Sequence, residues 1–473
     1  MSYAELQPKS FEPDALDRII NDTVAPTAEE IDRTGAFPRA ALDALGQAGF
    51  LGLISSPDVG GLGESHRAAT LVVERLAAAC ASTAMVLCMH YAGTAVIEAS
   101  GPLPLREAIA RGEHLTTLAF SEKGSRSHFW APTSTAQPAE SGVRLDAQKS
   151  WVTSAGQADS YVWSSRPLSA EGQSTIWLVP AETAGLTIPF QFDGMGLRGN
   201  HSSPINAEGV LVPAENMLGA DGDGFNIMMG IVLPYFQLMN AGFSVGMMEA
   251  ATTKAAQHVT GTKLEHLGQS LADLPTIRAY LSRMRIKTDM CRALLLDSLA
   301  ALEGGRADTM LRILEVKAAA GEASTEVTDL AMRVCGGAAF RKEVGVERHF
   351  RDARAATVMA IVAGVITAGR LVGPAAAGIV ALLPVVLTSL VLVMHPRVGG
   401  RTTAAVLANS IPGMVGFTCG LATLHLTLVP FGAAAALLLG LAVCVAWNVG
   451  LLALNLWSTR RIPGRAGARA GRK

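Results

Sequence analysis

Apolar residues recur at helical spacing through the first hundred residues of the chain. The first two groups are Leu16, Ile19 and Ile20, and then Ala41, Leu42 and Leu45. Residues three or four apart lie on one face of a helix, so this spacing predicts amphipathic helices. Gly49 suits the end of one helix, and Ser82 suits the N-cap of a later apolar run. Residues 1–114 are therefore predicted to form an α-helical domain.

The pattern changes at residue 115, where the apolar runs become short and rich in β-branched and aromatic residues. The runs are LTTLAF, SGVRLDA, SWVT, SYVWSS, STIWLVP, GLTIP and EGVLVP. Short runs separated by Gly, Pro, Ser and Asp are typical of antiparallel strands. Residues 115–218 are predicted to form a β domain, folded as a small antiparallel barrel or sandwich.

Helical spacing returns after Gly224 and continues to residue 358. The predicted helices are residues 225–258, 271–302, 309–334 and 344–358. Four helices with short connections are typical of a bundle. The predicted fold class is therefore α+β, with an N-terminal α-helical domain, a middle antiparallel β-barrel domain and a C-terminal four-helix bundle at residues 219–358.

The last hundred residues have a different composition. Between residues 358 and 457 there is no Lys, Asp or Glu, and the only charged residues are Arg370, Arg397 and Arg401. Three apolar segments, residues 371–394, 402–424 and 428–457, are each long enough to cross ~30 Å of hydrocarbon. We expect transmembrane helices within residues 371–457, a lipid bilayer as partner, and a basic tail at residues 458–473.

The charges around these segments give conflicting orientations. Arg397 and Arg401 mark the first loop as cytoplasmic, and the basic tail marks the C-terminus in the same way. Three spans would then export the preceding domains, yet the N-terminus lacks the features of a secretory signal. A re-entrant segment, an additional short span at residues 358–369, or a late fusion or frame error would each remove the conflict. We expect location at the inner (cytoplasmic) membrane, with the preceding domains in the cytoplasm.

Charge and cysteine content exclude several classes of function. The formal net charge is −1, which provides no basic field for nucleic acid. The six cysteines form no C-x-x-C pair and have no metal-site spacing with histidine. We therefore predict no nucleic-acid partner, no metal and no disulfide framework.

The segment KSWVTSAGQADSYVW (residues 149–163) predicts two strands around a turn. Side chains two apart on a strand face the same way, so Trp151 and Thr153 are predicted to share one surface. That surface is either ordinary core or a place for a flat ring.

Several motifs, in order, resemble the acyl-CoA dehydrogenase superfamily of flavoproteins over residues 10–358. They are AP at 25–26, IDRTGAFP at 31–38, GFLGL at 49–53, P-x-x-GGLG at 57–63, LAFSEKGSRSH at 118–128, KSWVT at 149–153, CGG at 335–337 and RDAR at 351–354. The resemblance implies an FAD cofactor, an α–β–α domain order and a homo-oligomer, either a dimer or a tetramer.

The resemblance also implies roles for individual residues. Phe120 and Ser121 would lie along the isoalloxazine ring, Ser127 would meet the pyrophosphate, and Trp151 would pack against the flavin with Thr153 near its N5 atom. Hydrogen-bond donors aimed at the ring stabilise the charge that develops as hydride arrives. The loop departs from the family pattern at Lys123, Arg126 and His128.

A neighbouring subunit completes the site in the family. Gly336 and Gly337 correspond to the two glycines that admit the neighbour's cofactor, and Arg333 stands in place of the usual Gln. The family's other contact to the neighbour's FAD has no clear equivalent around residues 260–268.

The family's catalytic glutamate is absent from both of its usual positions. The later position is Ala360, and the earlier one is Phe236, followed by Gln237 in place of the usual arginine. Removal of an α-proton requires a base, and His90 is a candidate because histidine titrates near neutral pH. A histidine on an apolar helix is also a common packed core residue.

Three functions are therefore open. The first is α,β-dehydrogenation of an acyl-CoA or acyl-carrier thioester, with an electron-transfer flavoprotein or O₂ as electron acceptor. The second is a flavin-dependent monooxygenase of the same fold, which needs no such glutamate. The third is a catalytically impaired fusion or a membrane-tethered binding protein.

Overall fold

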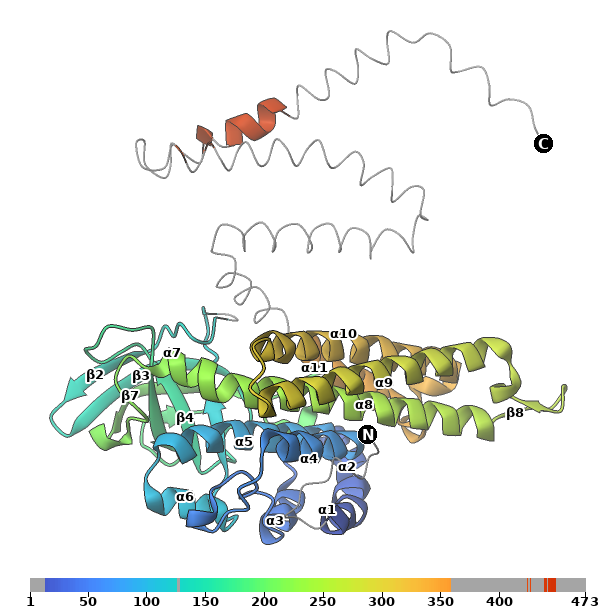
Figure 1. Ribbon diagram of the computed structural model, residues 1–473, viewed down its shortest axis with the longest axis horizontal. Coiled ribbons are helices and arrows are strands. Elements are labelled where there is room, and N and C mark those ends of the chain that lie inside the picture. Colours follow the sequence, from blue (N-terminus) through green and yellow to red (C-terminus); the bar gives the residue numbers. More distant parts are fainter. Residues whose placement is uncertain are drawn as a thin grey trace. The chain divides into compact units, whose positions relative to one another are not determined.

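The computed structural model describes residues 13–125 and 128–358, and beyond them residues 423, 426, 438–439 and 441–447 (Figure 1). The chain divides into two units, residues 1–367 and 368–473. Within the second unit the described residues are helical. The rest of the predicted membrane segments, and the basic tail, lie outside the described residues.

The N-terminal domain is helical, as predicted. Its elements are α1 Pro13–Ile19, the π-helix Ile20–Val24, α2 Ala25–Thr34, α3 Arg39–Gln47, the 3₁₀ turn Pro57–Val59, α4 His66–Ala79, α5 Ala81–Ser100 and α6 Leu103–Ala110. Gly49 follows α3 with φ 81°, which confirms it as a helix-ending residue. The N-cap prediction for Ser82 is wrong, because Ser82 lies inside α5 and its Oγ accepts the backbone N–H of Gly199 (3.1 Å).

The β domain consists of two separate sheets and not a closed barrel, so of the predicted barrel or sandwich the barrel is wrong. Its strands are β1 Thr116–Ala119, β2 Thr135–Ala139, β3 Gly142–Val152, β4 Ser160–Ser165, β5 Thr175–Pro180, β6 Leu186–Thr187 and β7 Ser203–Val212. The sheet orders are β1-β4-β5 and β2-β3-β7-β6. β1 pairs with β4 in parallel, so the first sheet is mixed. A shared core that includes Trp163 and Trp177 joins the two sheets.

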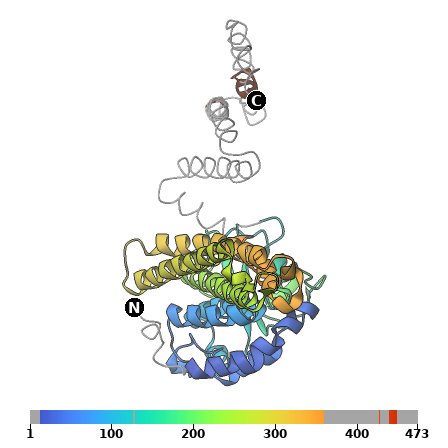
Figure 2. The same ribbon diagram turned by 90° about the vertical axis from the view of Figure 1, so that its right-hand side faces the viewer.

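The C-terminal bundle confirms the four predicted helices. It contains α7 Gly224–Ile227, the π-helix Met228–Val232, α8 Leu233–Gly261, α9 Pro275–Glu303, α10 Thr309–Cys335, the 3₁₀ helix Gly336–Phe340 and α11 Val346–Val358. A short hairpin, β8 Lys263–Leu264 and β9 Gln269–Ser270, follows α8. In Figure 2 the bundle helices, coloured green to orange, lie over the blue N-terminal helices.

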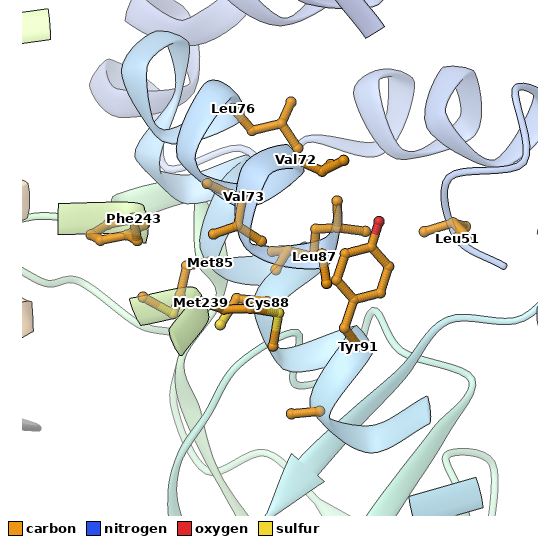
Figure 3. Packing of buried hydrophobic residues seen from close by; sticks show 14 of the residues in the cluster. Leu51, Val72, Val73, Leu76, Met85, Leu87, Cys88, Tyr91, Met239 and Phe243 are labelled. Carbon is orange, nitrogen blue, oxygen red and sulfur yellow. The ribbon is translucent and has the colours of Figure 1, made fainter. Parts of the chain in front are cut away.

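Helix α8 is buried on two sides, because it packs against α4 and α5 of the N-terminal domain and against α9 and α10 of the bundle. Figure 3 shows the first of these contacts, where Met239 and Phe243 of α8 meet Met85 and Cys88 of α5. Among the described residues, the helical stretch Gly224–Gly261 alone has the length and apolar composition of a membrane span. Its extensive burial in the protein interior explains that composition without a membrane.

The three domains meet at the start of the RDAR motif. Arg351 of α11 forms an ion pair with Asp32 of α2 (2.5 Å) and donates to the carbonyl of Met195 (2.9 Å). Asp352 accepts the N–H of Leu197 (2.6 Å), and burial raises the pKa of this carboxyl to about 6. This motif therefore connects the bundle to both other domains.

Candidate functional site

Trp151 is a large exposed aromatic residue of the β domain. Its side chain is 69% exposed, and its ring contacts that of Phe192 edge-to-face at a centroid distance of 6.3 Å. Its φ of 57° lies in the left-handed region, where a bulky residue is strained. The register of β3 against β7 shifts between Lys149 and Val152, so Trp151 sits within an irregularity of the strand.

This irregularity overturns the prediction that Trp151 and Thr153 share one strand face. Strand β3 ends at Val152, and Thr153 is buried with its Oγ1 3.1 Å from Oγ of Ser202. Strict alternation of side chains holds only while the backbone keeps extended angles and a constant register. The left-handed backbone conformation of Trp151 therefore turns its indole outward, while the side chain of Thr153 faces inward.

The segment after β1 runs beside Trp151. The carbonyl of Ser121 accepts the N–H of Ser150 (2.9 Å), and the N–H of Lys123 donates to Gln148 (3.0 Å). Ser121 is half-buried, whereas Phe120 is 6% exposed and belongs to the core that includes α5. The structure thus brings the segment that contains Ser121, which follows β1, alongside the end of β3 that contains Trp151.

A buried ion pair between Glu122 and Lys149 joins this segment to β3. The Nζ atom of Lys149 donates to Glu122 Oε1 (2.6 Å) and to the carbonyl (2.7 Å) and Oγ (3.0 Å) of Ser164. Glu122 also accepts the backbone N–H groups of Thr133 (2.5 Å) and Ser134 (3.0 Å) and both of their hydroxyls. Glu122 therefore closes the loop of residues 123–132 at its base.

The pKa of each partner reflects this arrangement. Burial favours the neutral form of Glu122, but Lys149 and the hydroxyl donors outweigh it and lower the pKa of Glu122 to about 2. Burial lowers the pKa of Lys149 to about 8, against the pull of Glu122. Sequence analysis did not single out this pair. The sequence feature that could have indicated the pair is the presence of Glu122 in LAFSEKGSRSH and of Lys149 in KSWVT, the two motifs proposed to bind flavin.

The loop that Glu122 closes carries the departures from the family pattern. Lys123 and His128 are exposed in this loop. Ser127, predicted to meet the pyrophosphate, lies outside the described residues together with Arg126. The ring of His128 packs edge-to-face on Trp130 at 5.0 Å.

His90 is fully buried on α5, and hydrogen bonds engage both of its ring nitrogens. Nε2 lies 3.0 Å from the carbonyl of Leu51, and Nδ1 accepts the N–H of Thr116 (3.2 Å). This pattern requires the neutral tautomer with a proton on Nε2. Burial lowers the pKa of His90 to about 4. The position supports a role in joining α5 to β1 and to the loop around Leu51.

Gly336 and Gly337 lie on the surface at the end of α10. Gly336 has φ 58°, and a Cβ added at either glycine would meet no described atom within 4 Å. Phe340, four residues after Gly336, is 82% exposed. This surface is open to a ligand or to a second copy of the chain.

The helical turn around Phe236 lies just after an irregular stretch of backbone and beside half-buried polar groups. It follows the π-helix Met228–Val232, and π-turns inside helices often occur at functional sites. The ring of Tyr235 stacks on His66 of α4 at 3.7 Å, and burial lowers the pKa of His66 to about 4. Phe236 itself is half-buried. The other glutamate position, Ala360, lies outside the described residues.

The described residues contain no cluster of three or more His, Cys, Asp or Glu side chains that could hold a metal ion.

Three family profiles match consecutive parts of the chain. They are the N-terminal, middle and C-terminal domains of acyl-CoA dehydrogenase, at residues 13–109, 117–210 and 222–363. Cyclohex-1-ene-1-carbonyl-CoA dehydrogenase of Syntrophus aciditrophicus is 30% identical over 339 residues, which cover 70% of this chain and 81% of that protein. The short-chain specific acyl-CoA dehydrogenase of Sus scrofa is 28% identical over 340 residues, with the same coverage.

Solved structures share the fold. Butyryl-CoA dehydrogenase from Megasphaera elsdenii matches with a TM-score of 0.71 at 24% identity, over 79% of this chain and 100% of that one. The FAD complex of PigA matches with a TM-score of 0.71 at 18% identity, over 79% of this chain and 99% of that one. Together with the profile matches and the 30% identical relative, this agreement shows that the chain belongs to the acyl-CoA dehydrogenase family.

Proposed function

We propose that the protein is an FAD-dependent oxidoreductase that removes hydrogen from the α and β carbons of an acyl thioester. Membership of the family supports this proposal, and one structural observation carries it. An exposed indole, Trp151, stands beside Ser121 on a bulge that the buried pair of Glu122 and Lys149 holds in place. An aromatic residue kept at the surface in a strained conformation is consistent with a role in binding a ligand.

The residues present suit a flavin. The indole of Trp151 offers a flat apolar face, and Ser121 offers a hydroxyl and a backbone N–H beside it. Phe120 and Thr153 are both buried, so the exposed part of this surface is formed by Trp151 and Ser121. When bound, FAD would supply the acceptor for the hydride. Ser127 would contact its pyrophosphate, and the open surface at Gly336 and Gly337 would receive the cofactor of a neighbouring copy in a homo-oligomer.

The chain's own residues would orient the substrate and exclude water. His90 donates one ring N–H and accepts one backbone N–H, so it has no free lone pair for an α-proton. We therefore propose a structural role for His90 and assign the proton acceptor to another group. An electron-transfer flavoprotein or O₂ would reoxidise the enzyme.

A flavin-dependent monooxygenase is the second candidate. The observation that favours it is Phe236, an apolar residue at one position where relatives carry the catalytic glutamate. A monooxygenase of this fold would not need a carboxylate there. The third candidate, a binding protein with an unused site, has no separate observation in its favour.

One experiment separates the three candidates. The purified protein is loaded with FAD and titrated anaerobically with a panel of saturated acyl-CoAs while its visible spectrum is recorded. Bleaching of the flavin band supports dehydrogenation. Consumption of NADH that depends on both O₂ and a partner reductase supports monooxygenation instead. Failure to bind FAD, with wild-type and Trp151→Ala proteins alike, contradicts both flavin-dependent functions.

We also propose that the C-terminal segments anchor the protein to the cytoplasmic membrane, with the flavin domain in the cytoplasm. The support is compositional, because residues 371–457 contain long apolar stretches without acidic residues or lysine. Fractionation of cells that express the full chain tests this proposal. A version that ends at residue 358 is the control and is expected in the soluble fraction. Recovery of the full chain in that same fraction would contradict the proposal.

A further inference from the structure

Two buried amide side chains in the first turns of α8 have unused acceptors. Gln237 is 2% exposed and Asn240 is 1% exposed. Neither Gln237 Oε1 nor Asn240 Oδ1 has a hydrogen-bond partner among the described residues. Buried side-chain oxygens are normally paired with protein or water, so two open acceptors within one helical turn require an explanation.

The orientation of the Asn240 amide follows from its neighbours. Its Nδ2 donates to the carbonyl of Phe236 (2.8 Å) and lies 3.8 Å from Sγ of Cys88 on α5. Reversing the amide would place Oδ1 against that carbonyl, and two acceptors would repel each other. The nitrogen therefore faces Phe236, and the oxygen remains the open group.

The two amides lie close to each other and to position 236. Residues three and four apart are neighbours on a helix surface, so Gln237 and Asn240 adjoin each other, and Asn240 adjoins Phe236. Phe236 occupies one of the positions of the base in the family resemblance. If the proposed function holds, this turn borders the acyl group of the substrate.

The chemistry of the open atoms restricts what the acyl group carries. Both atoms are acceptors, so the ligand must bring a hydrogen-bond donor. An ammonium group would bring an uncompensated charge into a buried site, whereas a hydroxyl remains neutral. Cys88, which Asn240 contacts, belongs to an apolar cluster that also contains Met85, Met239 and Phe243 (Figure 3), and apolar side chains of this kind suit the hydrocarbon part of the same chain.

We propose that a hydroxyl group on the acyl portion of the substrate donates its one hydrogen to the open oxygen of Asn240 or of Gln237, so that the enzyme selects hydroxylated acyl thioesters over plain ones. The inference rests on the proposed function and names the substrate class of that same site. A site built to bind a hydroxyl discriminates strongly against an analogue without one, because its own polar atoms are then left unpaired.

A matched pair of thioesters tests the proposal. Pentanoyl-CoA and 4-hydroxybutyryl-CoA have the same number of heavy atoms and differ by a terminal methyl in place of a hydroxyl. Each is titrated anaerobically into the FAD-loaded full-length protein, and dissociation constants are taken from the change in the flavin spectrum. We expect the hydroxylated compound to bind at least about tenfold more tightly.

Variants assign the preference to the two amides. Asn240→Leu and Gln237→Met keep the approximate size of the side chains and remove the open oxygens, so each is expected to reduce or reverse the preference. Thr252→Val is the control, because Thr252 is a buried polar residue of the same helix whose hydroxyl already donates to Met248 (2.7 Å). It is expected to keep the wild-type preference.

The outcomes separate this inference from the proposed function. If both thioesters change the flavin spectrum and bind equally, or if Asn240→Leu and Gln237→Met retain the full preference, the inference is wrong while the proposed function stands. If FAD binds but neither thioester changes its spectrum, the proposed function fails and the inference fails with it.

Discussion

Two buried polar clusters in this protein are in opposite states. In the β domain, Glu122 and Lys149 bury opposite charges, and the carboxylate and ammonium groups have several partners each. In α8, Gln237 and Asn240 bury neutral amides, and each leaves its oxygen without a partner among the described residues. The costlier groups are satisfied, and the less costly groups are not.

The difference fits a structural role for the first cluster and the ligand-binding role that we propose for the second. A buried charge without a partner costs far more than a buried amide, so the ion pair persists only because its network is complete. A neutral acceptor can stay open at a tolerable cost and still gain a partner from a substrate. The first cluster positions Ser121 and Trp151, and the second is the one for which we propose a ligand.

The largest expected effect comes from breaking the ion pair. Lys149→Met leaves Glu122 buried without its countercharge and is expected to lower the free energy of unfolding by about 3–5 kcal/mol. Urea denaturation followed by circular dichroism measures it. The double variant Glu122→Gln/Lys149→Met leaves no buried charge and should recover part of the loss. A single-variant effect below about 1 kcal/mol would contradict the importance of the pair.

The next largest effect is the change with pH in the stability that this ion pair contributes. The pKa of Glu122 is lowered to about 2 in the folded protein from 4.5. Its contribution is therefore present above pH 4.5 and is lost as the pH falls towards 2. We expect the stability difference between wild type and the double variant to shift against wild type by roughly 2–3 kcal/mol across this window. Parallel stability curves for the two proteins would refute this.

Substitutions of His90 test whether this residue is a hydrogen-bonded core residue or a catalytic base. His90→Leu removes the partners of the Leu51 carbonyl and the Thr116 N–H, and is expected to cost about 2 kcal/mol of unfolding free energy. The rate of flavin bleaching is measured as a function of pH for wild type and His90→Gln. We expect the two pH profiles to have the same inflections. An inflection near neutral pH that His90→Gln abolishes would restore His90 as a base.

Substitutions of Trp151 separate the cost of its strained backbone from its contribution to FAD binding. Trp151→Gly relieves the left-handed conformation, whereas Trp151→Ala retains it, so the glycine variant is expected to be more stable by about 1 kcal/mol. Both variants should bind FAD more weakly than wild type, as measured by quenching of flavin fluorescence. Equal stability of the two variants would show that the backbone relaxes when the indole is removed.

The smallest effect is expected at the open amides. In the absence of substrate, Asn240→Leu should change the free energy of unfolding by less than about 1 kcal/mol, and removal of an unsatisfied oxygen can even stabilise the protein. Thermal unfolding of the FAD-loaded protein with and without 4-hydroxybutyryl-CoA measures this. A large loss without substrate would show that Asn240 belongs to the structural class of buried groups.

Local pattern was sufficient for the helices and for the order of the domains. The amphipathic spacing before Gly49 and the long apolar periods of the bundle predicted their helices, because side-chain spacing follows from the pitch of the helix. The turn between β3 and β4 was predicted for a similar local reason. The motifs around Ser121 and Trp151 indicated the family before any geometry was known, and the profile matches confirm that family.

Only the tertiary structure decided the features that depend on distant partners. The parallel pairing of β1 with β4 joins residues more than forty positions apart, and the left-handed Trp151 arises where β3 changes register against β7. The hydroxyl of Ser82 accepts a hydrogen bond from the N–H of Gly199 instead of capping its own helix. Glu122 finds Lys149, and Asn240 finds Cys88, only after the chain has folded. The sequence alone determined helices, turns and family because these follow from neighbouring residues, whereas register, burial and the satisfaction of polar groups depend on contacts that local spacing does not encode.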